Sequence, residues 1–250
     1  MKLSSLEKSL QVIEELSRNP QGLSLSDLTR RLGFPKSTIH HMLSTLSPYD
    51  YVTQDPETRK YRLGFKFLTV GRTILENIDI RKIAHKHLRD LQQKCNGAVH
   101  LYVLRNGYLV CLDKIQDPGG GLSLATYIGF RTDPHAAASG KILLSELSEE
   151  EIQSIYKDRP LRVYGKNTIT SLTQLYEELE NIRRQGYAID NEEYYEGLRC
   201  VAAPVRAGGR IEAAVSITGS IFAMTMERIT RELLGLVTET AHAISAEMQW

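Results

Sequence analysis

The spacing of apolar residues changes once along this chain, and that change limits the folds it can adopt. Up to about Cys95, apolar residues recur every three or four positions, as on one face of a helix, apart from one short alternating stretch. The segment 98–115 has the period of strands, and Asn106-Gly107 between its two apolar runs predicts a tight hairpin. A helical first part and a mixed second part predict an α+β chain with a mostly antiparallel sheet.

Three short helices followed by a hairpin are predicted in residues 1–63. The apolar stripe of the first helix consists of Leu3, Leu6, Leu10, Ile13 and Leu16. The second is predicted in the string SLSDLTRRLG, with Ser24 as its N-cap. After the third, two alternating segments, 51–54 and 60–63, enclose a turn and predict a β-hairpin. This order of elements is that of a winged helix-turn-helix.

The outward side of the third helix carries no acidic residue. Its inward residues are expected to be Ile39, Met42, Leu43 and Leu46. No Asp or Glu lies between Arg30 and Tyr49, and because phosphate repels carboxylates, this face predicts contact with the major groove of double-stranded DNA. The hairpin adds cations suited to the DNA backbone. The candidate DNA-binding residues are Ser24, Arg30, Lys36, Ser37, Thr38, His40, His41, Ser44, Arg59 and Lys60.

Two other interpretations of this part compete with DNA binding. A winged helix can serve protein interaction alone, but an acid-free exposed helix with basic flanks favours nucleic acid. His40 and His41 are adjacent, and their side chains point about 100° apart on a helix, so they make a poor metal pair. No metal site is therefore expected here.

Overall charge and cysteine content exclude several classes of protein. Thirty-one Lys and Arg against thirty Asp and Glu give a net charge of +1, so any preference for an anionic partner must be local. Three widely spaced cysteines without a CxxC argue against a disulfide framework or a structural zinc site. No run approaches eighteen apolar residues, and the first residues do not form a signal peptide. A cytoplasmic protein without a membrane partner is expected.

Several elements are predicted in the remainder of the chain. Helices are expected at 135–146, 148–157, 171–186 and 225–248. Strands are expected at 122–127, 199–206 and 211–218.

Small and polar residues in this remainder predict a binding pocket for a small molecule. The string HAAASGK (135–141) places small side chains at a helix start, whose unpaired N–H groups suit a small carboxylate, although plain close packing would use the same residues. Lys141 could neutralise an anion or lie on the surface. Ser216 and Thr218 lie on one face of a strand, and buried hydroxyls need partners.

Asp190 differs from the acidic residues that follow it. It comes after the strand-like segment 187–189 and is expected to point into the fold, whereas Glu192, Glu193 and Glu196 are expected in solvent. The same cluster allows a rival hypothesis, a cysteine-dependent enzyme.

In that hypothesis Cys200 would be the nucleophile, His135 the base and Asp190 the orienting group. A single cysteine in an apolar strand is more often a buried small side chain, and no hydrolase, nucleotide or metalloprotease motif supports catalysis. A redox sensor through Cys200 or Cys111 would lack a resolving cysteine nearby in the sequence. We therefore expect no catalytic residue and no cofactor.

Five strings of the sequence resemble the IclR-type transcriptional regulators. They are SLEKSLQVIEELSRNPQGLSLSDLTRRLGFPKSTIHHMLSTL, YRLG, PHAAASGKILL, RRQGYAIDNEEYYEGLRCVAAPV and AAVSITG, which together span almost the whole chain. The resemblance implies a winged-helix domain at 1–63, a linker helix at 64–79 and a GAF-like effector-binding domain at 80–250. It also implies a homodimer or a dimer of dimers on a pseudo-palindromic operator.

The resemblance further implies a function and a set of effector contacts. The chain would be a ligand-responsive regulator, a repressor of a catabolic operon or alternatively an activator, controlled by a small carboxylate. The implied effector-binding residues are Leu124, Ala138, Ser139, Asp190, Cys200, Ser216 and Thr218. The linker stripe is a natural contact between protomers, unless it packs on its own domains; it consists of Phe67, Leu68, Gly71, Ile74 and Leu75.

Overall fold

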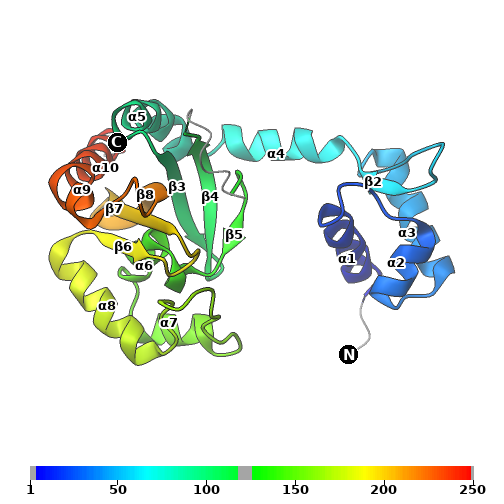
Figure 1. Ribbon diagram of the computed structural model, residues 1–250. Coiled ribbons are helices and arrows are strands. Elements are labelled where there is room, and N and C mark those ends of the chain that lie inside the picture. Colours follow the sequence, from blue (N-terminus) through cyan, green and yellow to red (C-terminus); the bar gives the residue numbers. More distant parts are fainter. Residues whose placement is uncertain (1–3, 118–125, 249–250) are drawn as a thin grey trace. The chain divides into compact units, whose positions relative to one another are not determined.

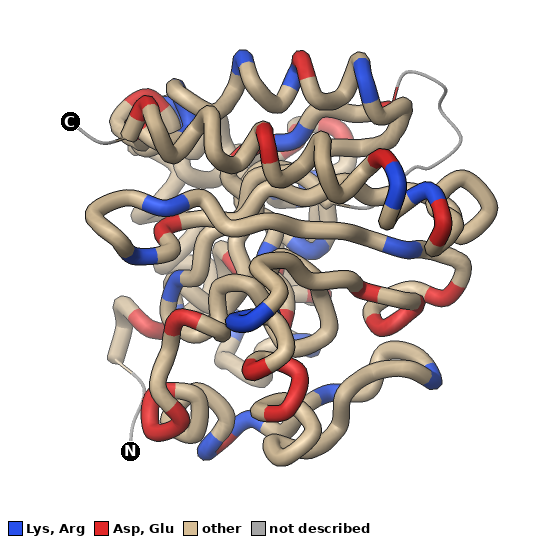
Figure 2. The backbone as a smooth tube through the Cα atoms, turned by 90° about the vertical axis from the view of Figure 1, so that its left-hand side faces the viewer, with Lys and Arg blue, Asp and Glu red and all other residues tan. Residues whose placement is uncertain are grey.

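The computed structural model describes residues 4–117 and 126–248. The chain divides into two compact units, with the boundary in the sequence between Asn77 and Ile78. The predicted strand at 122–127 therefore lies mostly outside the described residues, and Thr126 and Tyr127 are not in a strand. Lys and Arg are interspersed with Asp and Glu along the backbone (Figure 2).

The described residues of the first unit form a winged helix-turn-helix followed by a further helix (Figure 1). Its helices are α1 (Ser5–Ser17), α2 (Leu25–Leu32), α3 (Lys36–Leu46) and α4 (Lys66–Glu76), with a 3₁₀ turn at Ser47–Tyr49. Its strands are β1 (Val52–Gln54) and β2 (Tyr61–Leu63), which pair antiparallel. The helix starts follow local chemistry, because Ser4 and Ser24 each form a capping box with the residue three positions on.

The predicted stripe of α1 is only partly buried. Leu16 packs in the core of the unit, but Leu6 and Leu10 are 70% and 52% exposed. The other buried residue of α1 is Val12. At about 100° per residue, Val12 points about 200° around the helix from Leu10, so Leu10 faces away from the core. The helical period was thus correct, but Leu6 and Leu10 face solvent, and Leu3 lies outside the described residues.

The described part of the second unit contains one antiparallel sheet with the strand order β5-β4-β3-β8-β7-β6. The strands are β3 (Ala98–Arg105), β4 (Tyr108–Ile115), β5 (Arg131–Thr132), β6 (Ala188–Asn191), β7 (Leu198–Ala207) and β8 (Arg210–Ser220). The predicted turn between β3 and β4 is confirmed, and Asn106 and Gly107 adopt the positive φ angles of 52° and 72° that such a turn requires.

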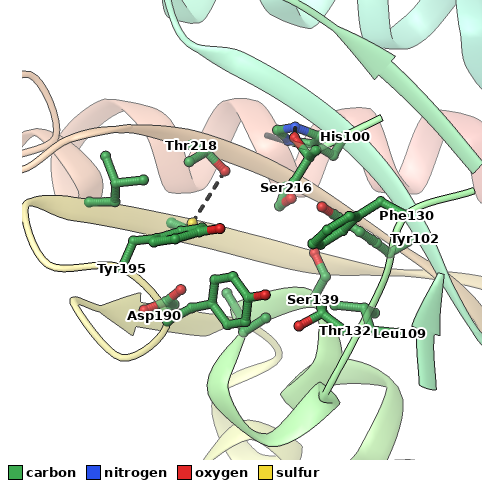
Figure 3. Close-up of a pocket in the computed structure, with 16 residues that line it drawn as sticks. His100, Tyr102, Leu109, Phe130, Thr132, Ser139, Asp190, Tyr195, Ser216 and Thr218 are labelled. Atoms are coloured by element: carbon green, nitrogen blue, oxygen red, sulfur yellow. Dashed lines mark hydrogen bonds between the residues drawn. The ribbon is translucent and has the colours of Figure 1, made fainter. Parts of the chain in front are cut away.

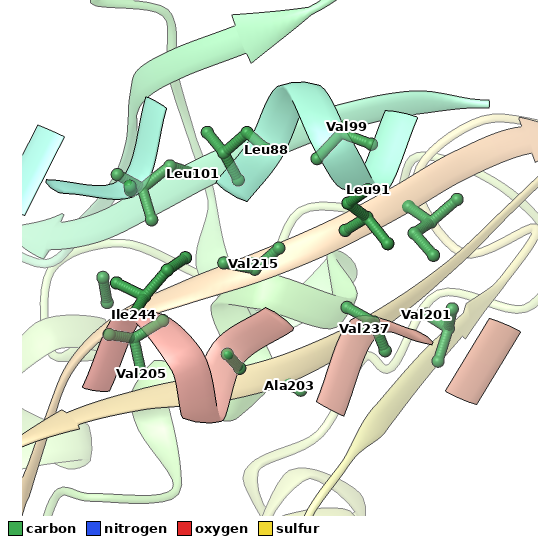
Figure 4. Close-up of a cluster of buried hydrophobic side chains, with 14 of the residues drawn as sticks. Leu88, Leu91, Val99, Leu101, Val201, Ala203, Val205, Val215, Val237 and Ile244 are labelled. Carbon is green, nitrogen blue, oxygen red and sulfur yellow. The ribbon is translucent and has the colours of Figure 1, made fainter. Parts of the chain in front are cut away.

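Helices cover both faces of this sheet (Figure 1). They are α5 (Asp79–Cys95), α6 (Ala138–Leu144), α7 (Glu149–Tyr156), α8 (Leu172–Gln185), α9 (Met226–Arg228) and α10 (Leu234–Glu247), with a π-helical turn at Ile229–Leu233 before α10. On one face, α5 and α10 press apolar side chains such as Leu88 and Val237 onto the strands (Figure 4). On the other face, α6, α7 and α8 form a second apolar cluster.

Strand alternation decides which side chains meet each face. Val215 and Ile217 of β8 point into the core under α5 and α10. Ser216, which lies between them, and Ala214 and Thr218 on either side therefore point to the opposite face, where α6 packs. This alternation places the hydroxyls of Ser216 and Thr218 on the face of the sheet that α6 covers.

The helix predicted at 135–146 begins later than expected. A 3₁₀ turn occupies Pro134–Ala136, Ala137 is extended, and α6 starts at Ala138. Gly140 lets the chain fold back on itself here, because a Cβ at this position would lie 2.1 Å from the carbonyl oxygen of Pro134. A larger residue at this position would therefore clash with the 3₁₀ turn that precedes α6.

Candidate functional site

The outward side of α3 presents the predicted polar residues to solvent. Lys36, Ser37, His40, His41 and Ser44 are exposed and Thr38 is half-buried, while Ile39, Met42 and Leu43 pack in the core. Ser44 donates its hydroxyl proton to the carbonyl oxygen of His41 at 2.8 Å. The predicted acid-free face is thus the exposed side of one regular helix, α3.

The remaining DNA candidates lie on the hairpin and on α2. Arg59 is exposed at the tip of the hairpin, and Lys60 beside it is half-buried. Ser24 and Arg30 are held by Asp27: the Ser24 hydroxyl donates to its carboxylate at 2.7 Å, and the Arg30 guanidinium donates to it at 2.6 Å. These two residues are thus tied to the start of α2, unlike the residues of α3 and the hairpin.

The second unit contains a pocket between the sheet and the start of α6 (Figure 3). Its volume is about 50 Å³, several times the 10–15 Å³ that one water molecule needs. Its described lining consists of His100, Tyr102, Leu109, Thr126, Phe130, Thr132, Ala137, Ala138, Ser139, Asp190, Tyr194, Tyr195, Leu198, Cys200, Ser216 and Thr218.

Six of the seven effector residues named from the sequence line this one pocket; they are Ala138, Ser139, Asp190, Cys200, Ser216 and Thr218. The seventh, Leu124, lies outside the described residues. Strand pairing brings the set together, because Asp190 of β6 lies opposite Cys200 of β7, which in turn lies opposite Thr218 of β8. The Thr218 hydroxyl donates to the Cys200 Sγ at 3.2 Å.

Several polar atoms of the pocket have no hydrogen-bond partner among the described residues. They are the Ser139 Oγ, the Thr132 Oγ1 and the His100 Nδ1, all buried. The first backbone bond of α6 is donated by the Lys141 N–H to the Ala137 carbonyl at 2.9 Å, so the N–H groups of Ala138 and Ser139 precede the helical ladder. Buried polar groups without partners indicate a site that a polar ligand can complete.

Among the described residues that line the pocket, Asp190 is the only one with an acidic side chain. Its Oδ1 accepts the backbone N–H of Glu193 at 2.8 Å. Burial, and next the charge of Glu193, raise the pKa of Asp190 to about 7, against the lowering effects of that hydrogen bond and of Lys141. The prediction that Asp190 points into the fold is confirmed.

Lys141 lies in neither of the two places expected for it. It is 1% exposed, and its Nζ donates to Glu193 at 2.7 Å, to Glu178 at 3.0 Å and to the Ile189 carbonyl oxygen at 2.8 Å. The expectation that Glu193 is solvated is wrong for the same reason, since this carboxylate is buried against the ammonium group. A buried charge needs such partners, and Lys141 does not line the pocket.

The cysteine-dependent enzyme receives no support from this geometry. His135 does not line the pocket; its Nε2 lies 3.0 Å from the Arg162 carbonyl oxygen and its Nδ1 faces the Tyr156 hydroxyl. Burial raises the pKa of Cys200 well above its usual value, and the nearby Asp190 raises it further, so the thiol stays protonated. Cys200 therefore has neither the proposed histidine base beside it nor thiolate character.

Several residues of the pocket wall were not predicted from the sequence. His100 and Tyr102 of β3, Thr132 of β5, and Tyr194 and Tyr195 after β6 all contribute to the lining. One signal for them existed: a histidine in the apolar strand that precedes the Asn-Gly turn is unusual for a core position. Its meaning depended on the pairing of β3 with β8, which short-range patterns do not give.

Comparison with known sequences identifies both parts of the chain. Residues 5–56 match the IclR helix-turn-helix domain, and residues 72–246 match the C-terminal domain of bacterial transcriptional regulators of the IclR type. The chain belongs to the IclR family of transcriptional regulators. None of its described helices is long and apolar enough to cross a membrane.

Similar proteins of the IclR family cover nearly the whole chain. The HTH-type transcriptional regulator XynR of Escherichia coli is 35% identical over 219 residues, 86% of each chain. The DNA-binding transcriptional repressor YiaJ of Escherichia coli is 33% identical over 248 residues, 98% of this chain and 87% of that one. An IclR homolog from Microbacterium hydrocarbonoxydans, crystallised with 4-hydroxybenzoate, superposes with a TM-score of 0.82 at 24% identity, covering 98% of this chain and 99% of that chain.

Proposed function

We propose that this IclR-family regulator is a repressor that binds a pseudo-palindromic operator and is released from it by a small carboxylate. The observation that carries the proposal is the pocket beneath α6, whose buried Ser139 and Thr132 hydroxyls lack partners among the described residues. The pocket belongs to a different compact unit from α3, so the sensing and DNA-binding roles fall on separate parts of the chain. YiaJ, a repressor, supports the direction of control.

The DNA-binding unit is assigned to residues 1–63. Thr38, His40, His41 and Ser44 of α3 face the major groove and read base edges, because they are among the polar donors and acceptors on its outward side. Lys36 and the hairpin residues Arg59 and Lys60 neutralise phosphates. Ser24 and Arg30 stand at the edge of this surface, and their bonds to Asp27 give them a positioning role at the start of α2.

The effector-binding domain is assigned to residues 80–250, and its ligand carries a carboxylate. Among the described residues that line the pocket there is no Lys or Arg. The anion is therefore held by the Ser139 hydroxyl together with the N–H groups of Ala138 and Ser139. Asp190 hydrogen-bonds a hydroxyl of the same ligand, as donor when protonated and as acceptor when ionised.

Two protomers are joined through the linker helix, residues 64–79. Leu68 and Ile74 of α4 are 68% and 57% exposed, although both are apolar and lie on the predicted stripe. A single winged helix buries too little surface for tight and specific DNA binding, so pairing two half-sites strengthens it. The assembly is a homodimer or a dimer of such dimers.

A titration of operator DNA with the full-length protein tests this function. Fluorescence anisotropy of a labelled operator would be followed while a panel of small carboxylates is added, and the acid would be recovered and analysed afterwards. We expect at least one acid to release the operator and to be recovered unchanged. Release with consumption of the acid would favour an enzyme, and no release by any acid that binds the protein would contradict the proposed control.

A further inference from the structure

His100 lies in the wall of the pocket, and one of its ring nitrogens has no hydrogen-bond partner among the described residues. The side chain is 1% exposed. Its Nε2 lies 3.2 Å from the Thr126 Oγ1, whereas its Nδ1 is buried and unpaired. Folded proteins rarely leave a buried polar atom without a partner, and His100 is one of the residues that line the cavity. The missing partner is therefore expected to be a bound molecule.

The position of His100 separates it from the side of the pocket that holds the carboxylate. In the pairing of β3 with β8, His100 lies directly opposite Ser216, and its ring stacks on Tyr102 with centroids 5.7 Å apart. Figure 3 shows His100 and Ser216 on one side of the cavity, with Ser139 and Asp190 on the other. A ligand whose carboxylate contacts Ser139 thus turns its other end toward His100.

The ring of His100 is uncharged at neutral pH. Burial and then the charge of Lys114 lower the pKa of His100 to about 3. A neutral imidazole nitrogen forms one ordinary hydrogen bond, as donor or acceptor according to the role that Nε2 takes toward Thr126. A hydroxyl or an amide can meet either role. A methyl group would leave Nδ1 unpaired. A second carboxylate would come near Lys114, which lies opposite His100 in the sheet and donates to the Thr126 carbonyl oxygen at 2.9 Å, but it would be buried with Asp190 in a described lining without Lys or Arg.

We propose that His100 determines effector specificity: its Nδ1 recognises an uncharged hydroxyl or amide on the effector, at the end remote from the carboxylate. This inference rests on the proposed function, since it takes the pocket as the effector site and Ser139 as the side that holds the acid. The effector class is then a carboxylic acid with a distal uncharged polar group. The cavity volume of about 50 Å³ favours a compact member of that class.

Two variants of His100 form a matched pair for the test. In His100→Asn the side-chain amide occupies the place of Nδ1, so the bond to the ligand is retained. In His100→Gln the amide reaches the place of Nε2, so the contact with Thr126 is retained and the bond to the ligand is removed. Both variants are polar and close in size to histidine, and operator binding without acid reports whether each one folds.

The probes are pairs of acids that differ only by a distal hydroxyl. Calorimetry of the full-length protein would compare 3-hydroxypropionate with propionate and 4-hydroxybenzoate with benzoate, with malonate as an acid charged at both ends. In the wild type we expect the hydroxy acid of at least one pair to bind about 10-fold more tightly than its partner, and malonate to bind more weakly. His100→Asn should keep this preference, and His100→Gln should reduce it to less than about 3-fold.

The outcomes separate this inference from the proposed function. If acids bind but the wild type shows no preference for the hydroxyl, or if His100→Gln keeps the wild-type preference, the role of His100 is contradicted and the pocket remains the effector site. If no acid of the panel binds, the proposed function and this inference fail together. A test without substitution uses protein labelled with ¹⁵N-histidine, in which the hydroxy acid, and not its partner, should shift the Nδ1 resonance of His100; an unchanged resonance with bound acid would overturn the inference.

Discussion

The two units of this regulator place their functional residues in opposite ways. On α3 the polar residues project into solvent from one continuous stretch of sequence, and their contacts require only a regular helix. In the pocket the polar residues are buried and come from α6 and several strands, with His100 and Ser216 more than a hundred positions apart but paired across the sheet. Substitutions on α3 should therefore alter DNA recognition without disturbing the fold, whereas substitutions in the pocket act on a buried network and need folding controls.

The largest effect is expected at the proposed contact between two protomers. Leu68→Glu should weaken the dimer at least about 100-fold and abolish cooperative operator binding, because an unpaired carboxylate buried in an interface costs several kcal/mol. Thr73→Glu is the control, since Thr73 lies about 140° around α4 from Leu68. Analytical ultracentrifugation would measure both variants. An intact dimer of Leu68→Glu would remove this face of α4 from the interface.

The effect of changing α3 should be smaller and confined to sequence preference. Thr38→Ala with His41→Ala should cost about 1–3 kcal/mol of discrimination at each base position that these side chains read. Arg59→Ala should instead weaken binding to all sequences alike and lower the slope of log affinity against log salt by about one. Binding assays with operator and random DNA over a salt series would separate the two. If Arg59→Ala altered base preference and left the slope unchanged, the hairpin would not touch the DNA backbone.

In the second unit, Ser216→Ala should lower effector affinity and leave operator affinity unchanged. The expected loss is about 1–3 kcal/mol, the usual cost of a polar ligand group left without its buried partner. Ser220→Ala is the matched control, because Ser220 ends the same strand but does not line the pocket. Calorimetry with the releasing acid would measure both. Equal affinities of the two variants would place the ligand away from β8.

The smallest effect is a pH dependence that comes from Asp190. An anionic effector raises the pKa of Asp190 further above its value of about 7, so binding takes up a proton. Affinity should therefore be constant from about pH 5 to 7 and fall by up to tenfold per unit above pH 7. Glu193, Lys141 and Cys200 also face Asp190, but Glu193 and Lys141 form an ion pair and Cys200 remains a thiol, so Asp190 is the group that titrates. Asp190→Asn should bind with a flat profile, and a profile like that of the wild type would assign the proton elsewhere.

Local patterns in the sequence predicted much of the fold. The N-cap at Ser24, the Asn106-Gly107 turn and the periods of α3 and β8 depend on residues a few positions apart, and all of these elements were predicted correctly. The shared strand face of Ser216 and Thr218 could be predicted because these residues are two positions apart. The apolar stripe of α1 shows the limit, because a helical period does not tell which side meets the core.

Features that depend on distant contacts were not predictable from short patterns. Lys141 is buried because Glu178 and Glu193, far along the chain, surround its ammonium group. Gly140 of α6 lies so close to Pro134 that a Cβ there would clash with the Pro134 carbonyl oxygen. The place of His100 in the pocket follows from the register of β3 with β8, which pairs His100 with Ser216. Each case needs the tertiary fold before the chemistry of the residue can be interpreted.

The central claim is that a small acid in the pocket of the second unit controls operator binding by the first. The most direct measurement is an operator release curve for the double variant Ser139→Ala, Ser216→Ala, recorded with increasing concentrations of the acid that releases the wild type. We expect the variant to bind operator without acid as tightly as the wild type does, and to need at least about 10-fold more acid for release. A release curve identical to that of the wild type would contradict control through this pocket.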